Sequence, residues 1–231
     1  MSFQRVVVLD TETTGLSHKN GDRIIEIACL ELEEGLYPTG RSLHYYLNPE
    51  REVSQGAFNV HGIGYDMLKD KPLFSDIAEP LWEFLKDAVL VIHNADFDMG
   101  FLNSEFGRLN YPFISNDRVV DTLKIARKKF PGASNSLDAL CQRFNISLED
   151  REKHGAVVDI KLLASVYVEL MQGGRQQSFL KNQSDFQTLQ NETNLSIQRK
   201  TFEFRSFHYD EETSQHKNFI LSKMKVNHWD D

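Results

Sequence analysis

The sequence has few cysteines, no excess of basic residues and no long apolar run. Its two cysteines, Cys29 and Cys141, lie in apolar periodic segments, which favours buried free thiols in a reducing compartment over a disulfide framework. No apolar stretch approaches the length of a membrane span, and the N-terminus lacks the basic and apolar regions of a secretory signal. We therefore expect a cytoplasmic protein with no membrane partner.

The formal net charge of the 231 residues is −8, and it is unevenly distributed. Acidic and basic residues balance from residue 172 onward, so the negative charge lies in residues 1–171. An acidic domain binds polyanions poorly by charge alone. If the ligand is a nucleic acid, we expect metal ions to offset the local charge and a partner protein to supply the grip on a long duplex.

The stretch Val6–Gly15 is the one around which the chain is organised. Three valines and a leucine predict a buried strand, and two carboxylates, Asp10 and Glu12, follow at once. Side chains alternate along a strand, so these two acids share one face while Thr11 points to the other. Adjacent carboxylates repel each other, and a divalent cation such as Mg²⁺ or Mn²⁺ would offset that repulsion. The alternative is an acidic turn in which Gly15 supplies a positive φ.

The remaining pattern predicts an α/β fold, a mixed five-stranded sheet flanked by helices. The first three strands are joined by short turns, which indicates an antiparallel meander. The expected strands after the first are 24–32, 42–47, 88–92 and 119–120. Ser75, Asp121 and Ser136 are the expected helix caps, and the last helix should end near Met171.

Composition divides the chain into three parts. Residues 1–171 carry the α/β pattern, and residues 172–198 contain seven glutamines with sparse apolar residues, as in a flexible linker. Apolar and aromatic residues return in 199–231, a segment too short for an independent core. We expect this segment to fold on a partner; the alternative is a tail that docks on its own domain.

Further candidate residues lie at the ends of the predicted elements. Asp98 falls in the first turn of one helix, Asp159 falls in the first turns of the last helix, and His154 precedes that helix. Each has an ordinary explanation alone, because an acid near a helix N-terminus is favoured by the helix dipole. Four acids and one histidine, all beside strand or helix ends, favour a shared site, since α/β sheets bind ligands there.

These residues form three motifs that resemble a known family. In order and separation they are similar to the DEDDh exonucleases of the DnaQ-like, RNase H-like superfamily: Asp10-x-Glu12, His93-Asn94-Ala95-x-Phe97-Asp98 and His154-x-x-x-x-Asp159. Longer stretches look like the epsilon (proofreading) subunits of bacterial DNA polymerase III: Asp10–Leu16, Val60–Ile63 and His154–Asp159. The resemblance implies an RNase H-like fold over the catalytic domain, residues 1–171.

The resemblance also implies a reaction, the metal-dependent hydrolysis of the terminal phosphodiester at a 3′ end. Two divalent ions, Mg²⁺ or Mn²⁺, would be held by Asp10, Glu12, Asp98 and Asp159. His154 would act as general base on the attacking water. The expected contacts to the substrate are those of Thr13 and His61, together with the metal-binding Asp10, Glu12 and Asp159.

The implied partners are a frayed or single-stranded 3′ end of DNA and two proteins. Residues 199–231 resemble a segment that binds the polymerase III alpha subunit, and Gln176–Leu180 looks like a sliding-clamp peptide. Two alternatives stay open. A free-standing DEDDh exonuclease acting on RNA or short oligonucleotides would need no tail, and a catalytically silent scaffold would show no nuclease activity.

Overall fold

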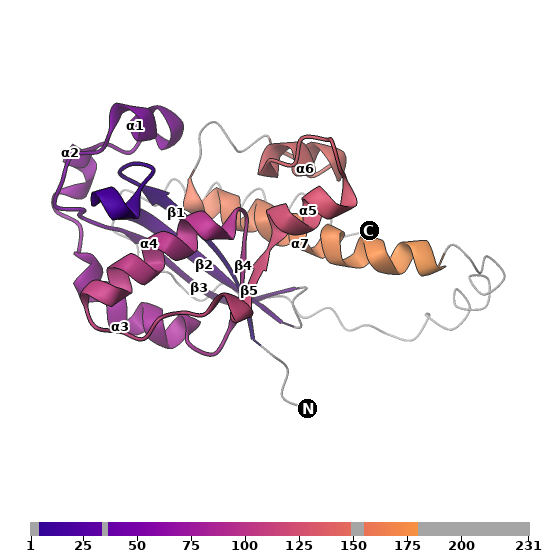
Figure 1. Ribbon diagram of the computed structural model, residues 1–231, viewed down its shortest axis with the longest axis horizontal. Helices are drawn as coiled ribbons and strands as arrows, with labels where there is room; N and C mark the ends of the chain where they lie inside the picture. Colours follow the sequence, from indigo (N-terminus) through magenta and orange to yellow (C-terminus); the bar gives the residue numbers. More distant parts are fainter. Residues whose placement is uncertain (1–4, 34–36, 149–154, 180–231) are drawn as a thin grey trace. The chain divides into compact units, whose positions relative to one another are not determined.

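The computed structural model describes residues 5–33, 37–148 and 155–179; for 172–179 it describes the backbone only. Its centre is one five-stranded sheet in the order β3-β2-β1-β4-β5 (Figure 1). The strands are β1 Val6–Thr13, β2 Ile24–Glu33, β3 Tyr37–Tyr46, β4 Val89–Ile92 and β5 Val119–Asp121. β1, β2 and β3 pair antiparallel, whereas β4 runs parallel to β1 and β5 parallel to β4. The predicted mixed five-stranded sheet, with its initial meander, is confirmed.

Helices cover both faces of the sheet (Figure 1). The α-helices are α1 Gln55–His61, α2 Tyr65–Leu68, α3 Phe74–Leu85, α4 Ala95–Arg108, α5 Thr122–Lys129, α6 Leu137–Arg143 and α7 Ala156–Phe179. Two short 3-10 helices, η1 His18–Asn20 and η2 Asn116–Arg118, lie in the connections. None of the helices in the described ranges is long and apolar enough to cross a membrane.

The alternation of β1 divides the core in two. Val7 and Leu9 pack with α3 and α4 in one cluster, while Val6 and Val8 pack with α6 and α7 in the other. Each of these four side chains is at most 7% exposed, so β1 is covered on both faces. The same alternation continues past Leu9 and decides which helix each polar side chain of the strand meets.

Two predicted helix caps are present and one is wrong. Asp121 accepts hydrogen bonds from Leu123 N and Lys124 N at the start of α5, and Ser136 caps α6. Ser75 does not cap α3, because that helix begins one residue earlier with Leu73 as its N-cap. There Asp76, the third residue of the helix, accepts the N–H of the N-cap residue Leu73 at 2.8 Å, which is the return hydrogen bond of a capping box.

Helix α7 continues past Met171, where the apolar periodicity ends, to Phe179. Glutamine, arginine and serine are compatible with a helix, so the end of the apolar periodicity did not mark the end of α7. Residues Gln176–Phe179 of the proposed clamp peptide belong to the end of α7. Leu180, the rest of the predicted linker and residues 199–231 lie outside the described residues.

Candidate active site

Three acids meet where β1 emerges from the core. Asp10 and Glu12 lie on the face of β1 that is covered by α7, and Asp159 comes from the first turn of that helix. Carboxylate oxygens of the three residues lie within 4.8 Å of one another. Their parent elements, distant in sequence, pack directly together in the core. We refer to Asp10, Glu12 and Asp159 as the acid cluster.

The electrostatics of the acid cluster fit a divalent cation. Burial raises the pKa of Asp10 well above its usual range, and the charges of Asp98, Asp159, Glu12 and Glu26 raise it further. A bound cation would stabilise the ionised form of these carboxylates. A set of ligands made up only of carboxylate oxygens suits Mg²⁺ or Mn²⁺. The three acids therefore have the chemistry and spacing of a metal-binding set.

Asp98 lies beside the acid cluster and is held from the other face of β1. It occupies the first turn of α4, where its Oδ1 accepts hydrogen bonds from Thr11 N at 3.1 Å and Thr11 Oγ1 at 2.7 Å. Thr11 is the residue that alternation placed opposite Asp10 and Glu12. The contact between Thr11 and Asp98 was not predicted. The sequence feature that could have indicated it is a polar residue on the same face of β1 as the buried Val7 and Leu9.

Burial raises the pKa of Asp98 from near 3.8 to about 7, against the opposing effect of the Thr11 hydrogen bonds. In metal-free protein, the folded state therefore binds more protons than the unfolded state between those two pH values. We expect the free energy of unfolding in EDTA to fall by roughly 1–3 kcal/mol as the pH rises from 5 to 8. Thermal denaturation of wild type and Asp98→Asn across this range measures it. Equal pH dependence in both proteins would contradict the expectation.

His61 stabilises the turn after β1 through a hydrogen bond to its backbone. Ile63 N donates to His61 Nδ1 at 3.0 Å, so the ring carries its proton on Nε2 and donates to Thr13 O at 3.2 Å. Thr13 Oγ1 in turn donates to Gly15 O at 2.6 Å. These contacts of the two predicted substrate residues go to the backbone of the turn, so His61 and Thr13 fix its shape.

Gly15 does not supply the positive φ of the alternative interpretation, and it is required for another reason. Its φ is not in the left-handed region. A Cβ at this position would lie 2.5 Å from the carboxylate of Asp22. That carboxylate accepts hydrogen bonds from Thr14 Oγ1 and Ser17 N, so it cannot move away without releasing the turn.

A buried ion pair ties the same turn to α4. Arg23 Nε and Nη2 donate to the two oxygens of Glu105 at 2.6 and 2.9 Å, and Arg23 N donates to Thr14 Oγ1 at 3.0 Å. The Glu105 side chain is only 4% exposed. Removal of the guanidinium would therefore leave a buried carboxylate uncompensated.

We expect Arg23→Ala to lower the free energy of unfolding by about 3–5 kcal/mol, the range for breaking one side of a buried pair. Urea denaturation of the metal-loaded protein measures this change. A paired Arg23→Met, Glu105→Met variant is the control, and it should recover most of the loss because no buried charge remains. A loss below about 1 kcal/mol in the single variant would show that the pair is not buried in solution.

A cavity of about 750 Å³ opens beside the acid cluster. Its lining includes Asp10 and Asp159, the turn between β4 and α4, α5, and the α5–α6 connection, among them His93, Arg127 and Asn135. Ser136 had been noted only as a helix cap, and Leu123 and Arg127 of α5 were missed because they carry no motif of their own. The predicted general base, His154, lies outside the described residues.

Comparison with known proteins gives one family. The family model described as Exonuclease matches residues 7–167. DNA polymerase III subunit epsilon of Rickettsia felis is 42% identical over 232 residues, covering 98% of this chain and 100% of that protein. The same subunit of Salmonella typhimurium is 41% identical over 226 residues, covering 94% of this chain and 92% of that protein.

Solved structures give the same fold. Exonuclease X in complex with 5′ overhanging duplex DNA superposes with a TM-score of 0.58 at 25% identity, covering 73% of this chain and 92% of that one. The nuclease domain of 3′hExo, a DEDDh family member bound to rAMP, superposes with a TM-score of 0.63 at 17% identity, covering 75% of this chain and 94% of that one. The second likeness shows the fold alone.

Proposed function

The chain belongs to the exonuclease family, and we propose that it removes mismatched 3′-terminal nucleotides from DNA as the proofreading epsilon subunit of a bacterial DNA polymerase III. The acid cluster of Asp10, Glu12 and Asp159 is the observation that carries the nuclease activity. The subunit assignment rests on relatives 41–48% identical that bear this name. This role would place the protein in the bacterial cytoplasm.

Divalent cations, Mg²⁺ or Mn²⁺, are the cofactors that the acids fit. We assign one ion to the acid cluster and a second to Asp10 together with Asp98, which Thr11 holds beside it. Two bound ions would stabilise the charge that develops on the attacking and leaving oxygens of an in-line displacement. Without the ions, Asp10 and Asp98 disfavour ionisation, as their raised pKa values show.

The protein residues orient the reactants and move a proton. His154 accepts a proton from the water whose oxygen attacks the terminal phosphorus. The new P–O bond forms as the bond to the 3′ oxygen of the penultimate nucleotide breaks. That oxygen takes up a proton from solvent, which leaves a chain with a new 3′ hydroxyl and a free nucleoside 5′-monophosphate. The turn braced by His61 and Thr13 lies beside the acid cluster, where it can receive the terminal nucleotide.

The domain arrangement follows the same proposal. In this proposal residues 1–171 form the exonuclease domain, 172–198 form a linker whose first residues continue α7, and 199–231 form the segment that binds the polymerase alpha subunit. Gln176–Leu180 is the proposed clamp contact. A frayed 3′ end is the proposed substrate, since a paired end would have to melt before it reached the acids.

The deciding experiment compares a 3′-mismatched primer–template, the matched duplex and an RNA oligonucleotide, each with Mg²⁺, Mn²⁺ or EDTA. We expect metal-dependent mononucleotide release that is fastest from the mismatched DNA. Release from RNA alone would favour a free-standing exonuclease, and none from any substrate would favour a scaffold.

Recovery of a polymerase subunit by immobilised 199–231 peptide, with a scrambled peptide as control, tests the partner separately.

A further inference from the structure

A carboxylate of the neighbouring strand β2, that of Glu26, lies across from Glu12 of the acid cluster. Glu26 is the register partner of Glu12 on the neighbouring strand, and its side chain is buried at 1% exposure. Two carboxylates opposite each other in a sheet are destabilising. Glu26 also raises the pKa of Asp10 through its charge. The repulsion between Glu26 and these acids must be offset by favourable contacts, and the hydrogen bonds of Glu26 indicate what those contacts do.

Each oxygen of Glu26 has its own donor. Oε1 accepts a hydrogen bond from His44 Nε2 on β3 at 2.8 Å. Oε2 accepts the backbone N–H of Ala156 at 3.2 Å. Ala156 is the first residue of α7, so Glu26 satisfies an N–H that the helix itself cannot pair, and its charge is favoured by the helix dipole.

This contact reaches a residue that the proposed chemistry uses. Asp159 follows Ala156 by three residues, so both lie on the same face of α7, and both are buried. The Glu26–Ala156 hydrogen bond joins the first turn of α7 to β2. The Asp159 carboxylate of the same turn has an oxygen within 4.8 Å of oxygens of Asp10 and Glu12.

We propose that Glu26, held by His44, is a positioning residue that sets the start of α7 and thereby places the Asp159 carboxylate in the acid cluster. Glu26 need not touch the substrate or an ion for this. His44 keeps the Glu26 side chain in place through Oε1, leaving Oε2 aimed at the helix. The inference rests on the proposed exonuclease function, since its readouts are those of that reaction.

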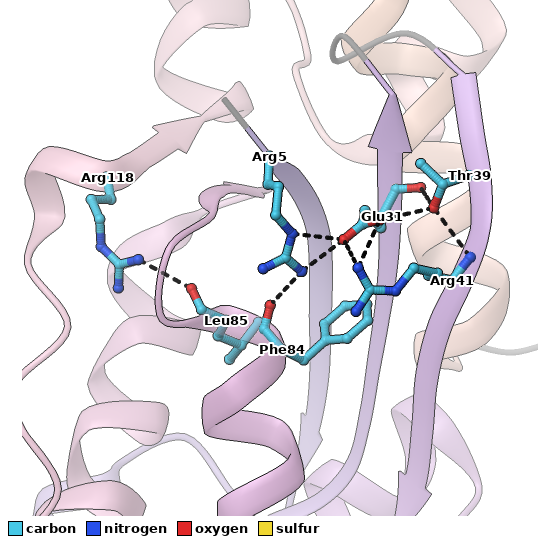
Figure 2. A network of polar contacts seen from close by, with 7 residues as sticks. All are labelled: Arg5, Glu31, Thr39, Arg41, Phe84, Leu85 and Arg118. Carbon is cyan, nitrogen blue, oxygen red and sulfur yellow. Dashed lines mark hydrogen bonds and ion pairs between the residues drawn. The ribbon is translucent and has the colours of Figure 1, made fainter. Parts of the chain in front are cut away.

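The same two strands offer a matched control at their other end. Glu31 of β2 is also buried, and it too is held from β3, by Arg41 Nη1 at 3.0 Å and by Thr39 Oγ1 at 3.1 Å (Figure 2). Its other partner is Arg5, which also donates to Phe84 O at the end of α3 (Figure 2). Glu31 thus resembles Glu26 in its strand, its burial and its support by a side chain of β3, but the structure gives it no hydrogen bond to the start of α7 among the described residues.

The test compares Glu26→Ala, Glu26→Gln and Glu31→Ala in the full chain, with a single-stranded DNA oligonucleotide and a titration of Mn²⁺. We expect Glu26→Ala to lose about 10–100-fold in kcat or in apparent Mn²⁺ affinity, the range for residues that orient metal ligands, with KM for DNA changed less than threefold. Glu26→Gln should lose less than fivefold, because its amide oxygen can still accept the Ala156 N–H. Glu31→Ala should lower the melting temperature without these losses.

Three outcomes would overturn the inference while the wild type remains active: no greater loss in Glu26→Ala than in Glu31→Ala, an equal loss in Glu26→Gln and Glu26→Ala, or a loss confined to KM. If Glu26→Ala does not fold, His44→Phe replaces it and should lose activity that His44→Gln, which keeps a donor, restores. Lack of restoration would count against the inference. An inactive wild type would instead refute the proposed function itself.

Discussion

Asp10→Ala is expected to lower the rate of 3′ mononucleotide release by at least about 10³-fold, equivalent to roughly 4 kcal/mol of transition-state stabilisation. Asp10 is the one acid assigned to both ions, so its loss removes a ligand from each. The fold should survive, because the half-buried Asp10 carboxyl is held in an unfavourable environment by its neighbours. In EDTA the variant should melt at or above the wild-type temperature.

The control for Asp10→Ala is Asp96→Asn. Asp96 is also an acid near the site, in the first turn of α4, but it is exposed and pairs with Lys124 at 3.0 Å. Its removal should leave the rate within twofold of wild type, as measured with a 5′-labelled oligonucleotide and saturating Mn²⁺. An Asp10→Ala protein with more than a tenth of the wild-type rate would show that another group binds the ions.

His154→Ala is expected to lower kcat about 10²–10⁴-fold, the range for removal of a general base. The apparent affinity for Mn²⁺ should stay within threefold of wild type, because His154 is not assigned to an ion. The wild-type rate should fall as the pH is lowered and the histidine gains its proton, and the variant should lose that limb of the profile. Added imidazole should restore part of the rate.

The pH profile separates this role from a structural one. A variant that lost activity equally at every pH, with no rescue by imidazole and weaker Mn²⁺ binding, would indicate that His154 supports the start of α7 and does not transfer a proton. A variant within tenfold of wild type at every pH would show that another base acts.

Much of the fold follows from local patterns in the sequence. The valine-rich β1, the caps Asp121 and Ser136 and the antiparallel meander are all visible in residue order. The edge strand β3 was predicted five residues too short at its start, because Tyr37–Arg41 lacks the apolar alternation of a strand with one buried face. Backbone pairing with β2, which the sequence does not display, makes this segment a strand.

The residues of the candidate site were also predictable only in part. Alternation places Asp10 and Glu12 on one face of β1, and the motif spacing names Asp98 and Asp159 as their companions. The supporting contacts were not predictable: Thr11 with Asp98, Asp22 against Gly15, and Glu26 with Ala156. Each of these contacts joins residues that are brought together only by the packing of the chain. None of them can be inferred from local periodicity or composition.

The most direct test of the central claim, that these acids form the metal centre of a nuclease, is a calorimetric titration of the full chain with Mn²⁺. It is run with a deoxynucleoside 5′-monophosphate, the proposed product, and repeated with Asp10→Asn. We predict saturable binding of two ions per wild-type chain and the loss of at least one ion in the variant. Absence of saturable binding, or identical isotherms for the two proteins, would contradict the account.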